Sequence, residues 1–111
     1  MLIKWLCSQN DIVHYQTERE LKMENGNLNA YPDLIIIKNN DSEIYVEFER
    51  TRKSPDRFRT KLINLREWLA VGGKIHWITL TQTLANWIEN QINTIGAYPI
   101  QHTYEIWNNE K

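Results

Sequence analysis

The chain has 111 residues, 41% of them hydrophobic and 24% charged, and its net charge is -1. These values are near the averages of globular proteins, so they argue against disorder and predict a single domain over residues 1–111. The lone cysteine excludes an internal disulfide and a cysteine zinc site. No stretch approaches the ~20 apolar residues of a membrane span and no signal peptide is evident, so we expect a soluble cytoplasmic protein.

The first predicted element is a helix near residue 17. Thr17-Glu18-Arg19-Glu20 has the spacing of a capping box, in which a hydroxyl group precedes a carboxylate by three residues. Asn25-Gly26 is a typical helix stop. An earlier start of this helix, near Asp11, is the alternative. The short segment 2–7 is assigned to neither a helix nor a strand.

Two strands separated by a polar turn are predicted next. Residues 34–37 are a continuous β-favouring run directly after Pro32-Asp33, which predicts a strand covered on both faces with Asp33 at its entry. Residues 43–49 alternate in polarity, so the strand that they form has two different faces. One face carries Ile44, Val46 and Phe48, and the other carries Glu43, Tyr45, Glu47 and Glu49. The short turn between the two strands predicts a hairpin.

The second half of the chain predicts a helix, a strand and another helix. Ser54-Pro55 is a typical helix start, a hydroxyl cap followed by proline. The buried stripe of this helix is expected to contain Phe58, Leu62, Leu65 and Leu69, and Gly72-Gly73 to end it. A β-rich run covers 75–80, a helix begins near Thr83, and 102–107 is a candidate last strand. The predicted class is α/β, ordered helix, strand, strand, helix, strand, helix, with a candidate extra strand at each end.

Three carboxylates are expected to meet at the predicted hairpin. Glu47 and Glu49 share one face of their strand, roughly 7 Å apart. If the preceding strand pairs antiparallel, Asp33 lies beside them. Such a cluster raises carboxylate pKa values unless a cation binds, and its hard oxygen ligands suit Mg²⁺ or Mn²⁺, which can activate water and stabilise a phosphoryl group. The alternatives are a solvated face of an edge hairpin for the glutamates and a turn role for Asp33.

Positive charge is concentrated directly after the acidic strand. Seven of the 13 basic residues fall between positions 50 and 66, namely Arg50, Arg52, Lys53, Arg57, Arg59, Lys61 and Arg66. A patch of this kind can hold a nucleic-acid backbone, so DNA is the expected partner. The alternative is the solvated side of an amphipathic helix. Lys53 is expected either to hold the scissile phosphate or to neutralise Glu47 or Glu49.

These motifs resemble the replication–relaxation family, which is associated with mobile plasmids and conjugative elements. The resemblance covers about residues 15–68 and is carried by Tyr31-Pro32-Asp33, Val46-Glu47-Phe48-Glu49 and Thr51-Arg52-Lys53-Ser54. The family is similar to conjugative relaxases whose catalytic domains are related to restriction endonucleases. The resemblance therefore implies a restriction-endonuclease-like PD-(D/E)XK fold with an αβββαβ core, a small mixed sheet and flanking helices.

The resemblance also implies a function and a set of site residues. Asp33, Glu47 and Glu49 would bind Mg²⁺ or Mn²⁺, and Glu18 would match the helix acid that precedes the PD motif, unless it is an ordinary first-turn acid. The expected activity is metal-dependent DNA nicking in plasmid mobilisation or replication, and the alternative is an inactive DNA-binding accessory protein.

The chain departs from the family pattern in two ways. Glu49 replaces the usual nuclease lysine, so the phosphate-stabilising charge would have to come from elsewhere, with Lys53 as the candidate. Relatives usually carry a winged-helix module for which this chain has no room, so DNA recognition would depend on a separate protein or a homodimer.

Overall fold

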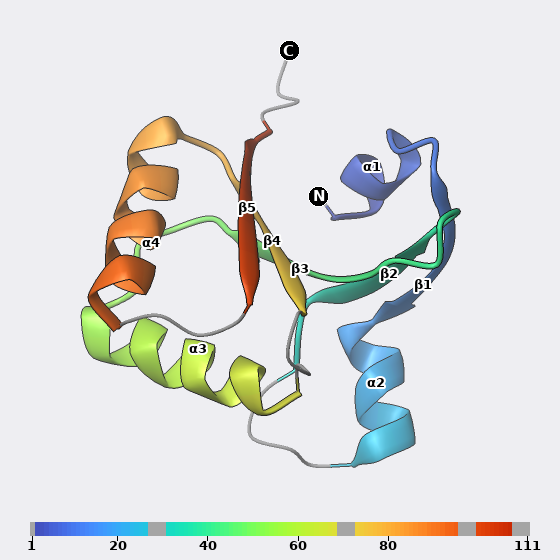
Figure 1. The fold of residues 1–111 in the computed structure, drawn as a ribbon, viewed down its shortest axis with the longest axis horizontal. Helices are drawn as coiled ribbons and strands as arrows, with labels where there is room; N and C mark the ends of the chain where they lie inside the picture. Colours follow the sequence, from blue (N-terminus) through green and yellow to red (C-terminus); the bar gives the residue numbers. More distant parts are fainter. Residues whose placement is uncertain (1, 27–30, 69–72, 96–99, 108–111) are drawn as a thin grey trace.

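The computed structural model describes residues 2–26, 31–68, 73–95 and 100–107, and its elements follow the predicted α/β order (Figure 1). The elements are α1 (Leu2–Cys7), β1 (Ile12–Thr17), α2 (Glu18–Asn25), β2 (Leu34–Lys38), β3 (Glu43–Glu49), α3 (Pro55–Trp68), β4 (Lys74–Thr79), α4 (Gln82–Ile95) and β5 (Gln101–Ile106). The candidate last strand is present, as β5, whereas the strand at the amino end, β1, lies at residues 12–17, where no strand was predicted. The unassigned opening segment is a short helix.

The five strands form one mixed sheet in the order β1-β2-β3-β4-β5. β1, β2 and β3 are successively antiparallel, whereas β3, β4 and β5 are parallel. The predicted hairpin is confirmed, because β2 pairs with β3 through partners such as Leu34 and Val46. β3 is the central strand, so the alternative of a hairpin at the edge of the sheet is wrong.

The start of α2 is fixed by its capping box. The Glu20 backbone N–H donates to the Thr17 hydroxyl, and the Glu20 carboxylate accepts from the Thr17 backbone N–H. These two bonds satisfy backbone donors that the first helical turn leaves free. An earlier helix start near Asp11 is wrong, since residues 12–17 pair with β2 as a strand.

Helices cover both faces of the sheet, and each face has its own hydrophobic cluster. α3 and α4 lie on one side and α1 on the other (Figure 1). The cluster under α3 and α4 includes Phe58, Leu62 and Trp77, whereas the cluster under α1 is formed by Trp5, Leu34, Ile36, Val46 and Ile78. Because strand side chains alternate, consecutive residues of β3 enter different clusters. The acids of β3 therefore lie on the α3 side.

The two long helices follow the predicted apolar spacing. In α3 the Ser54 hydroxyl accepts from the Arg57 backbone N–H, and Phe58, Leu62 and Leu65 are buried. The remaining stripe residue, Leu69, and Gly72 of the stop signal lie outside the described residues. α4 buries Leu84, Ala85, Ile88 and Ile92. Within the described ranges, no helix is long and apolar enough to cross a membrane.

Candidate functional site

The hairpin brings Asp33 and Glu47 together at one end of the sheet. Leu34 is the register partner of Val46, so the residues next to them lie side by side. The Asp33 backbone N–H donates to Glu47 Oε2 at 2.6 Å, and the Phe48 backbone N–H donates to Asp33 Oδ2 at 2.8 Å. Each carboxylate is thus held by a backbone donor of the other strand segment, which fixes its position more firmly than side-chain packing alone.

Glu47 and Glu49 are buried on the face that α3 covers. Their relative exposures are 0% and 3%, although Glu43 at the start of the same strand face is exposed. The alternative of a solvated acid face is therefore wrong for Glu47 and Glu49. A buried charged carboxylate is unfavourable unless an opposite charge or hydrogen bonds compensate it, so the surroundings of this pair must supply both.

Two lysines supply the compensating charge. The Lys61 ammonium group, on α3, lies 2.8 Å from Glu47 Oε1 and also donates to Glu49 Oε1. Lys53, in the loop before α3, donates to Glu49 Oε2 at 2.6 Å. Lys53 therefore neutralises Glu49, as one of its two predicted roles requires. Lys61 was expected only in the DNA-binding patch, and its place between the acids was missed.

Helical spacing contains a signal that could have located Lys61. It lies three residues after Phe58 and four before Leu65, both in the buried stripe of α3. Residues three and four apart share a helix face, so Lys61 belongs to the side that packs on the sheet rather than to the solvated side. A lysine on the buried side requires an acid opposite it, and β3 carries those acids.

The pKa values of the site are shifted mainly by burial. Burial raises the pKa of Glu47 to about 8, with Asp33 adding to the effect and Lys61 opposing it. Burial also raises the pKa of Asp33, against the hydrogen bond from Phe48. Burial alone would lower the pKa of Lys61, but the Glu47 and Glu49 carboxylates raise it, so the ammonium stays charged. A further cation in this cluster would favour full ionisation of both acids.

The donor chemistry of the cluster fits a hard divalent cation, but the present arrangement is not a ready metal site. Among the residues that the structure describes, no three His, Cys, Asp or Glu side chains are grouped so that they could hold a metal ion. Glu47 Oε1 is buried and accepts no well-oriented hydrogen bond from the described chain, and only the Lys61 charge faces it. The carboxylate oxygens of Asp33, Glu47 and Glu49 suit Mg²⁺ or Mn²⁺, and the Lys61 ammonium would have to move aside for one.

Glu18 lies near this cluster in the first turn of α2. Its backbone N–H donates to the Asp33 carbonyl at 3.2 Å, and its charge contributes to the raised pKa of Asp33. Its carboxylate pairs with Lys22 at 3.1 Å. Both predicted roles of Glu18, a fourth acid of the site and an ordinary first-turn acid, fit these contacts.

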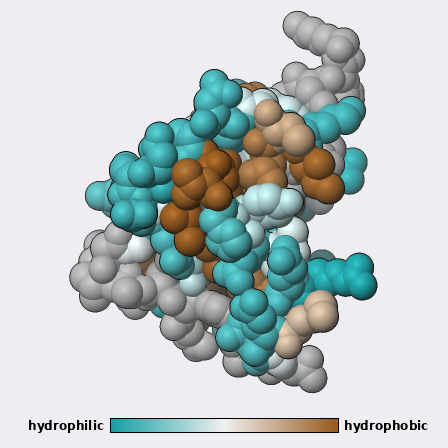
Figure 2. Space-filling model, turned by 90° about the vertical axis from the view of Figure 1, so that its right-hand side faces the viewer, coloured by the Kyte–Doolittle hydropathy of each residue, from teal (hydrophilic) through white to brown (hydrophobic). Residues whose placement is uncertain are grey.

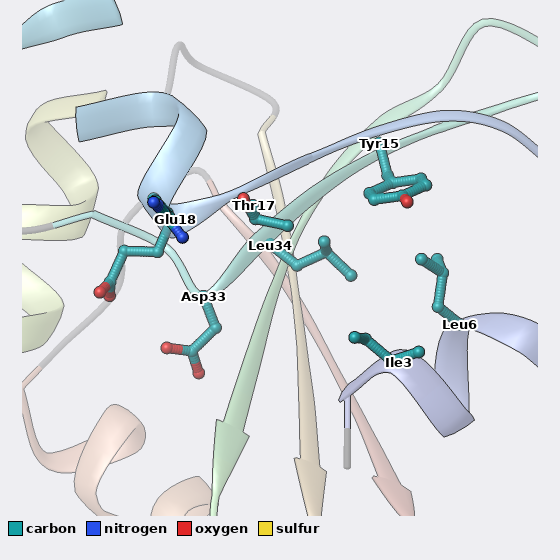
Figure 3. A pocket seen from close by; sticks show the side chains of 8 residues that line it. Ile3, Leu6, Tyr15, Thr17, Glu18, Asp33 and Leu34 are labelled. Carbon is teal, nitrogen blue, oxygen red and sulfur yellow. The ribbon is translucent and has the colours of Figure 1, made fainter. Parts of the chain in front are cut away.

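A pocket of about 410 Å³ adjoins Asp33 on the α1 side of the sheet. Figure 3 shows its apolar part, formed by Ile3 and Leu6 of α1 with Tyr15 and Leu34 of the sheet. Asp33 and Glu18 lie at its other end (Figure 3). Because Glu47 and Glu49 have almost no exposed surface, Asp33 is the member of the cluster that a molecule in this pocket can reach.

Six of the seven basic residues between positions 50 and 66 fall into three groups, and the seventh, Arg66, is half-buried in the last turn of α3. Arg50, Arg57 and Arg59 are exposed. The Arg52 guanidinium lies 5.0 Å from the ring centre of Trp87, a cation–π contact that ties the loop before α3 to α4. Lys53 and Lys61 are bound to the acids. The exposed arginines are thus the members available for a nucleic-acid backbone, and their role stays a prediction.

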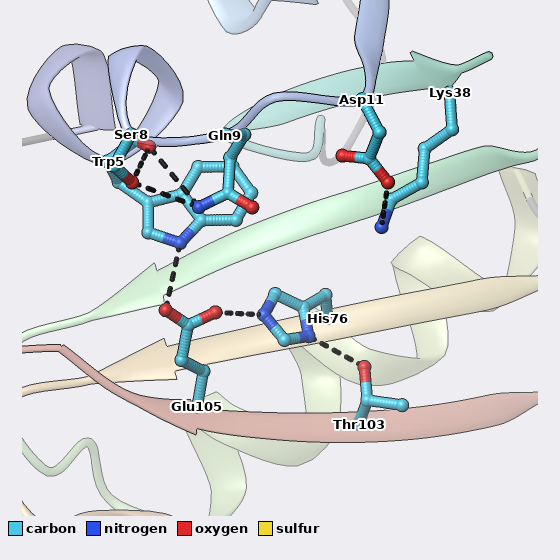
Figure 4. A network of polar contacts seen from close by, with 8 residues as sticks. All are labelled: Trp5, Ser8, Gln9, Asp11, Lys38, His76, Thr103 and Glu105. Atoms are coloured by element: carbon cyan, nitrogen blue, oxygen red, sulfur yellow. Dashed lines mark hydrogen bonds and ion pairs between the residues drawn. The ribbon is translucent and has the colours of Figure 1, made fainter.

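A second polar network lies on the opposite face of the sheet (Figure 4). Trp5 Nε1 donates to Glu105 Oε2 at 3.1 Å, and His76 lies 2.8 Å from Glu105 Oε1 and 2.7 Å from the Thr103 hydroxyl. His76 and Thr103 are register partners on β4 and β5. The network fastens α1 to the parallel half of the sheet.

Comparisons with protein-family models, curated proteins and solved structures found no match to this chain. The likeness to the replication–relaxation family therefore depends on the short motifs alone. The function is best argued from the contacts and charges of the acid cluster.

Proposed function

We propose that this protein is a metal-dependent phosphodiesterase that cuts DNA, with a restriction-endonuclease-like core. The observation that carries the proposal is a pair of hydrogen bonds, in which the Asp33 N–H holds the Glu47 carboxylate and the Phe48 N–H holds the Asp33 carboxylate. Buried Glu49 lies on the same face, and two lysines lie beside the acids. The order of α1, the antiparallel strands β1 to β3, α3 and the parallel strand β4 supports the αβββαβ assignment, with α2 as an insertion between β1 and β2.

Asp33, Glu47 and Glu49 would hold Mg²⁺ or Mn²⁺ in this reaction. The bound cation would lower the pKa of a water molecule and neutralise charge on the phosphate. Lys61, released from the acids, stays tethered to α3 beside them and would donate to the phosphate oxygen where negative charge develops. Lys61 would thereby replace the phosphate-stabilising lysine that stands at the position of Glu49 in the usual nuclease pattern. Lys53 would hold Glu49 in place.

The exposed arginines would position the DNA backbone against this centre. Arg57 and Arg59 project from the first turns of α3, the helix that also carries Lys61. Arginine and lysine contacts to phosphate are independent of base sequence. Recognition of a particular site in plasmid mobilisation or replication would then come from a separate protein or a second copy of the chain.

One observation favours a second candidate, an inactive DNA-binding accessory protein of a mobilisation or replication complex. Lys61 already pairs with both Glu47 and Glu49, and Lys53 pairs with Glu49 as well. The acids are therefore compensated without a metal, as a structural ion-pair network would be. This candidate requires salt-sensitive DNA binding that survives replacement of Glu47 and Glu49.

Nicking of supercoiled plasmid with Mg²⁺ or Mn²⁺ separates the two candidates. We expect the wild-type protein to convert plasmid to the open circle, and Asp33→Asn and Glu47→Gln to reduce the rate by at least a hundredfold. Glu43→Gln is the matched control, because Glu43 lies on the same face of β3 but is exposed. If plasmid and single-stranded DNA both stay intact at high protein concentration, the nuclease is contradicted, and retained DNA binding by Glu47→Gln would then favour the accessory protein.

Thermal unfolding gives a readout of metal binding that does not depend on activity. A cation at ~100 times its Kd stabilises the folded state by ~2.7 kcal/mol, which raises Tm on the order of 10 °C for a chain of this size. We expect Mn²⁺ to produce this shift in the wild type and in Glu43→Gln, but not in Glu47→Gln. An equal shift in all three proteins would place the cation elsewhere.

A further inference from the structure

We infer that the pocket beside Asp33 binds an unpaired nucleobase of the strand that is cut, so that the substrate is single-stranded or locally unpaired nucleic acid. The inference rests on the proposed function and names its substrate class. It depends on the residues that line the pocket, which are apolar at one end and charged at the other.

The apolar end of the pocket has the chemistry of a base platform. Tyr15 on β1 is 45% exposed, and Ile3 of α1 is 75% exposed. Together with Leu6 and Leu34 they line one end of a pocket of about 410 Å³, as Figure 3 shows. Seen from the side of α1, β1 and α2, apolar side chains gather in one region framed by hydrophilic ones (Figure 2). An exposed aromatic ring among aliphatic side chains is a surface on which the flat face of a base can stack.

The other end of the pocket connects this platform to the acid cluster. Asp33 lines both the pocket and the cluster, and its carboxylate is fixed by the Phe48 backbone N–H. When a phosphate lies at Asp33, the base of the adjoining nucleotide is one sugar away, on the side of Tyr15. The platform and the acids thus fit two parts of one nucleotide.

A cation at the rim of the pocket fits the neighbouring phosphate. Arg19 lines the pocket and is exposed, and it forms no ion pair with the described part of the chain. The acids on either side of Arg19 in the chain are engaged, since Glu18 pairs with Lys22 and Glu20 caps α2. A DNA strand that runs from Asp33 past Arg19 would therefore meet the fixed Asp33 carboxylate and then one uncompensated positive charge.

Base pairing excludes a duplex from this arrangement. A base within a duplex is stacked between its neighbours and paired across the helix, so its face cannot lie on Tyr15 unless it is first extruded. A single strand, a flap or an unpaired junction presents its bases without the free-energy cost of extruding them from a duplex. The pocket therefore selects unpaired substrates by stacking rather than by reading a base sequence.

Fluorescence anisotropy with a labelled DNA strand tests the inference. Binding is measured at low salt with Ca²⁺ as the hard cation, for the single strand and for its duplex. We expect the full chain to bind the single strand at least tenfold more tightly. Tyr15→Ala should weaken single-strand binding about tenfold, the effect of a base–aromatic stack worth about 1.4 kcal/mol, and leave duplex binding unchanged. Tyr15→Phe keeps the ring and should bind like the wild type.

Val13→Ala is the matched control, because Val13 is exposed on the same strand and does not line the pocket. Circular dichroism and Tm establish that each variant is folded. Equal affinity of the wild type for both forms of DNA, or an unchanged affinity of Tyr15→Ala, would overturn the inference. If plasmid nicking still depends on Glu47, the proposed function survives that result. If neither form of DNA binds, both proposals fall.

Discussion

Glu47 and Lys61 are the two side chains on which the character of the site depends. Glu47 has no exposed surface, and the Lys61 ammonium 2.8 Å away is the positive charge that faces its free oxygen. A pair of this kind is weak evidence for stability when both partners are present, because both charges lose hydration. Removal of only one partner is destabilising, because it leaves the other charge buried and unpaired.

We predict that Lys61→Met lowers the free energy of unfolding by about 3–5 kcal/mol at pH 9, above the pKa of about 8 of Glu47, where the wild-type pair is ionised. This is the typical effect of removing one partner of a buried ion pair. Adding Glu47→Gln to Lys61→Met should restore part of that loss, because the acid left without its partner is then uncharged. Denaturant unfolding of the two single variants and the double variant measures both effects.

Lys22→Met is the control for this prediction. Lys22 pairs with Glu18 at 3.1 Å, but both side chains are about half exposed, so the loss should be under about 1 kcal/mol. A loss for Lys61→Met no larger than that for Lys22→Met would mean that water, rather than Lys61, compensates the acids.

At the scale of elements, the parallel pair β4 and β5 is joined by a side-chain bond across its α4 face. The fully buried Trp77 indole donates from Nε1 to His102 Nδ1 at 3.0 Å. His102 must therefore be neutral at Nδ1 to accept this bond. Burial, with a smaller effect of Arg66, lowers the pKa of His102 to about 4.

We predict that buried His102 makes the protein less stable as the pH falls from about 6.5 to about 4. In that range the unfolded chain binds a proton on His102 and the folded chain does not, so acid favours unfolding. Above about pH 6.5 the histidine is neutral in both states and contributes no pH dependence. Unfolding free energies across this range should decrease more steeply for the wild type than for His102→Gln.

His14→Gln is the matched control, because His14 is exposed on β1. Its stability profile should follow that of the wild type. If both variants lose unfolding free energy with falling pH as steeply as the wild type, the acid sensitivity comes from groups other than His102. The bond between Trp77 and His102 is then not its cause.

For the whole molecule, the distribution of charge matters more than its sum. The net charge is only -1, yet the acids Glu47 and Glu49 are buried while Arg50, Arg57 and Arg59 remain exposed. Folding therefore buries these two acids and leaves the three arginines exposed. A chain that is acidic in total can present a basic surface to a phosphate backbone.

We predict that Arg57→Ala with Arg59→Ala weakens single-stranded DNA binding and flattens its salt dependence. Each phosphate contact contributes ~0.7 to the slope of log K against log salt on a single strand, so the double variant should lose about 1.4. Lys74→Ala is the control, since Lys74 begins β4, whose other end, Thr79, is the register partner of Glu49. An equal slope for the wild type and the double variant would remove α3 from the interface.

Local sequence patterns were sufficient for the order of elements from α2 onward and for the pairing of Asp33 with Glu47. The Thr17–Glu20 capping box, the Ser54-Pro55 start and the alternation along β3 act between residues close in the chain, so the residues themselves encode them. The turn between β2 and β3 is short enough to make antiparallel pairing the expected outcome. Register then placed the aspartate beside the glutamate.

Tertiary packing decided what the sequence left open. Whether the acid face of β3 met water or a helix depended on α3 crossing over it and on β4 pairing beside it, both contacts between distant segments. The same packing selected Lys61 to face Glu47, and it made residues 12–17 a strand by giving them β2 as a partner. Alternation along a strand states which side chains share a face; only the assembled layers determine which face is buried.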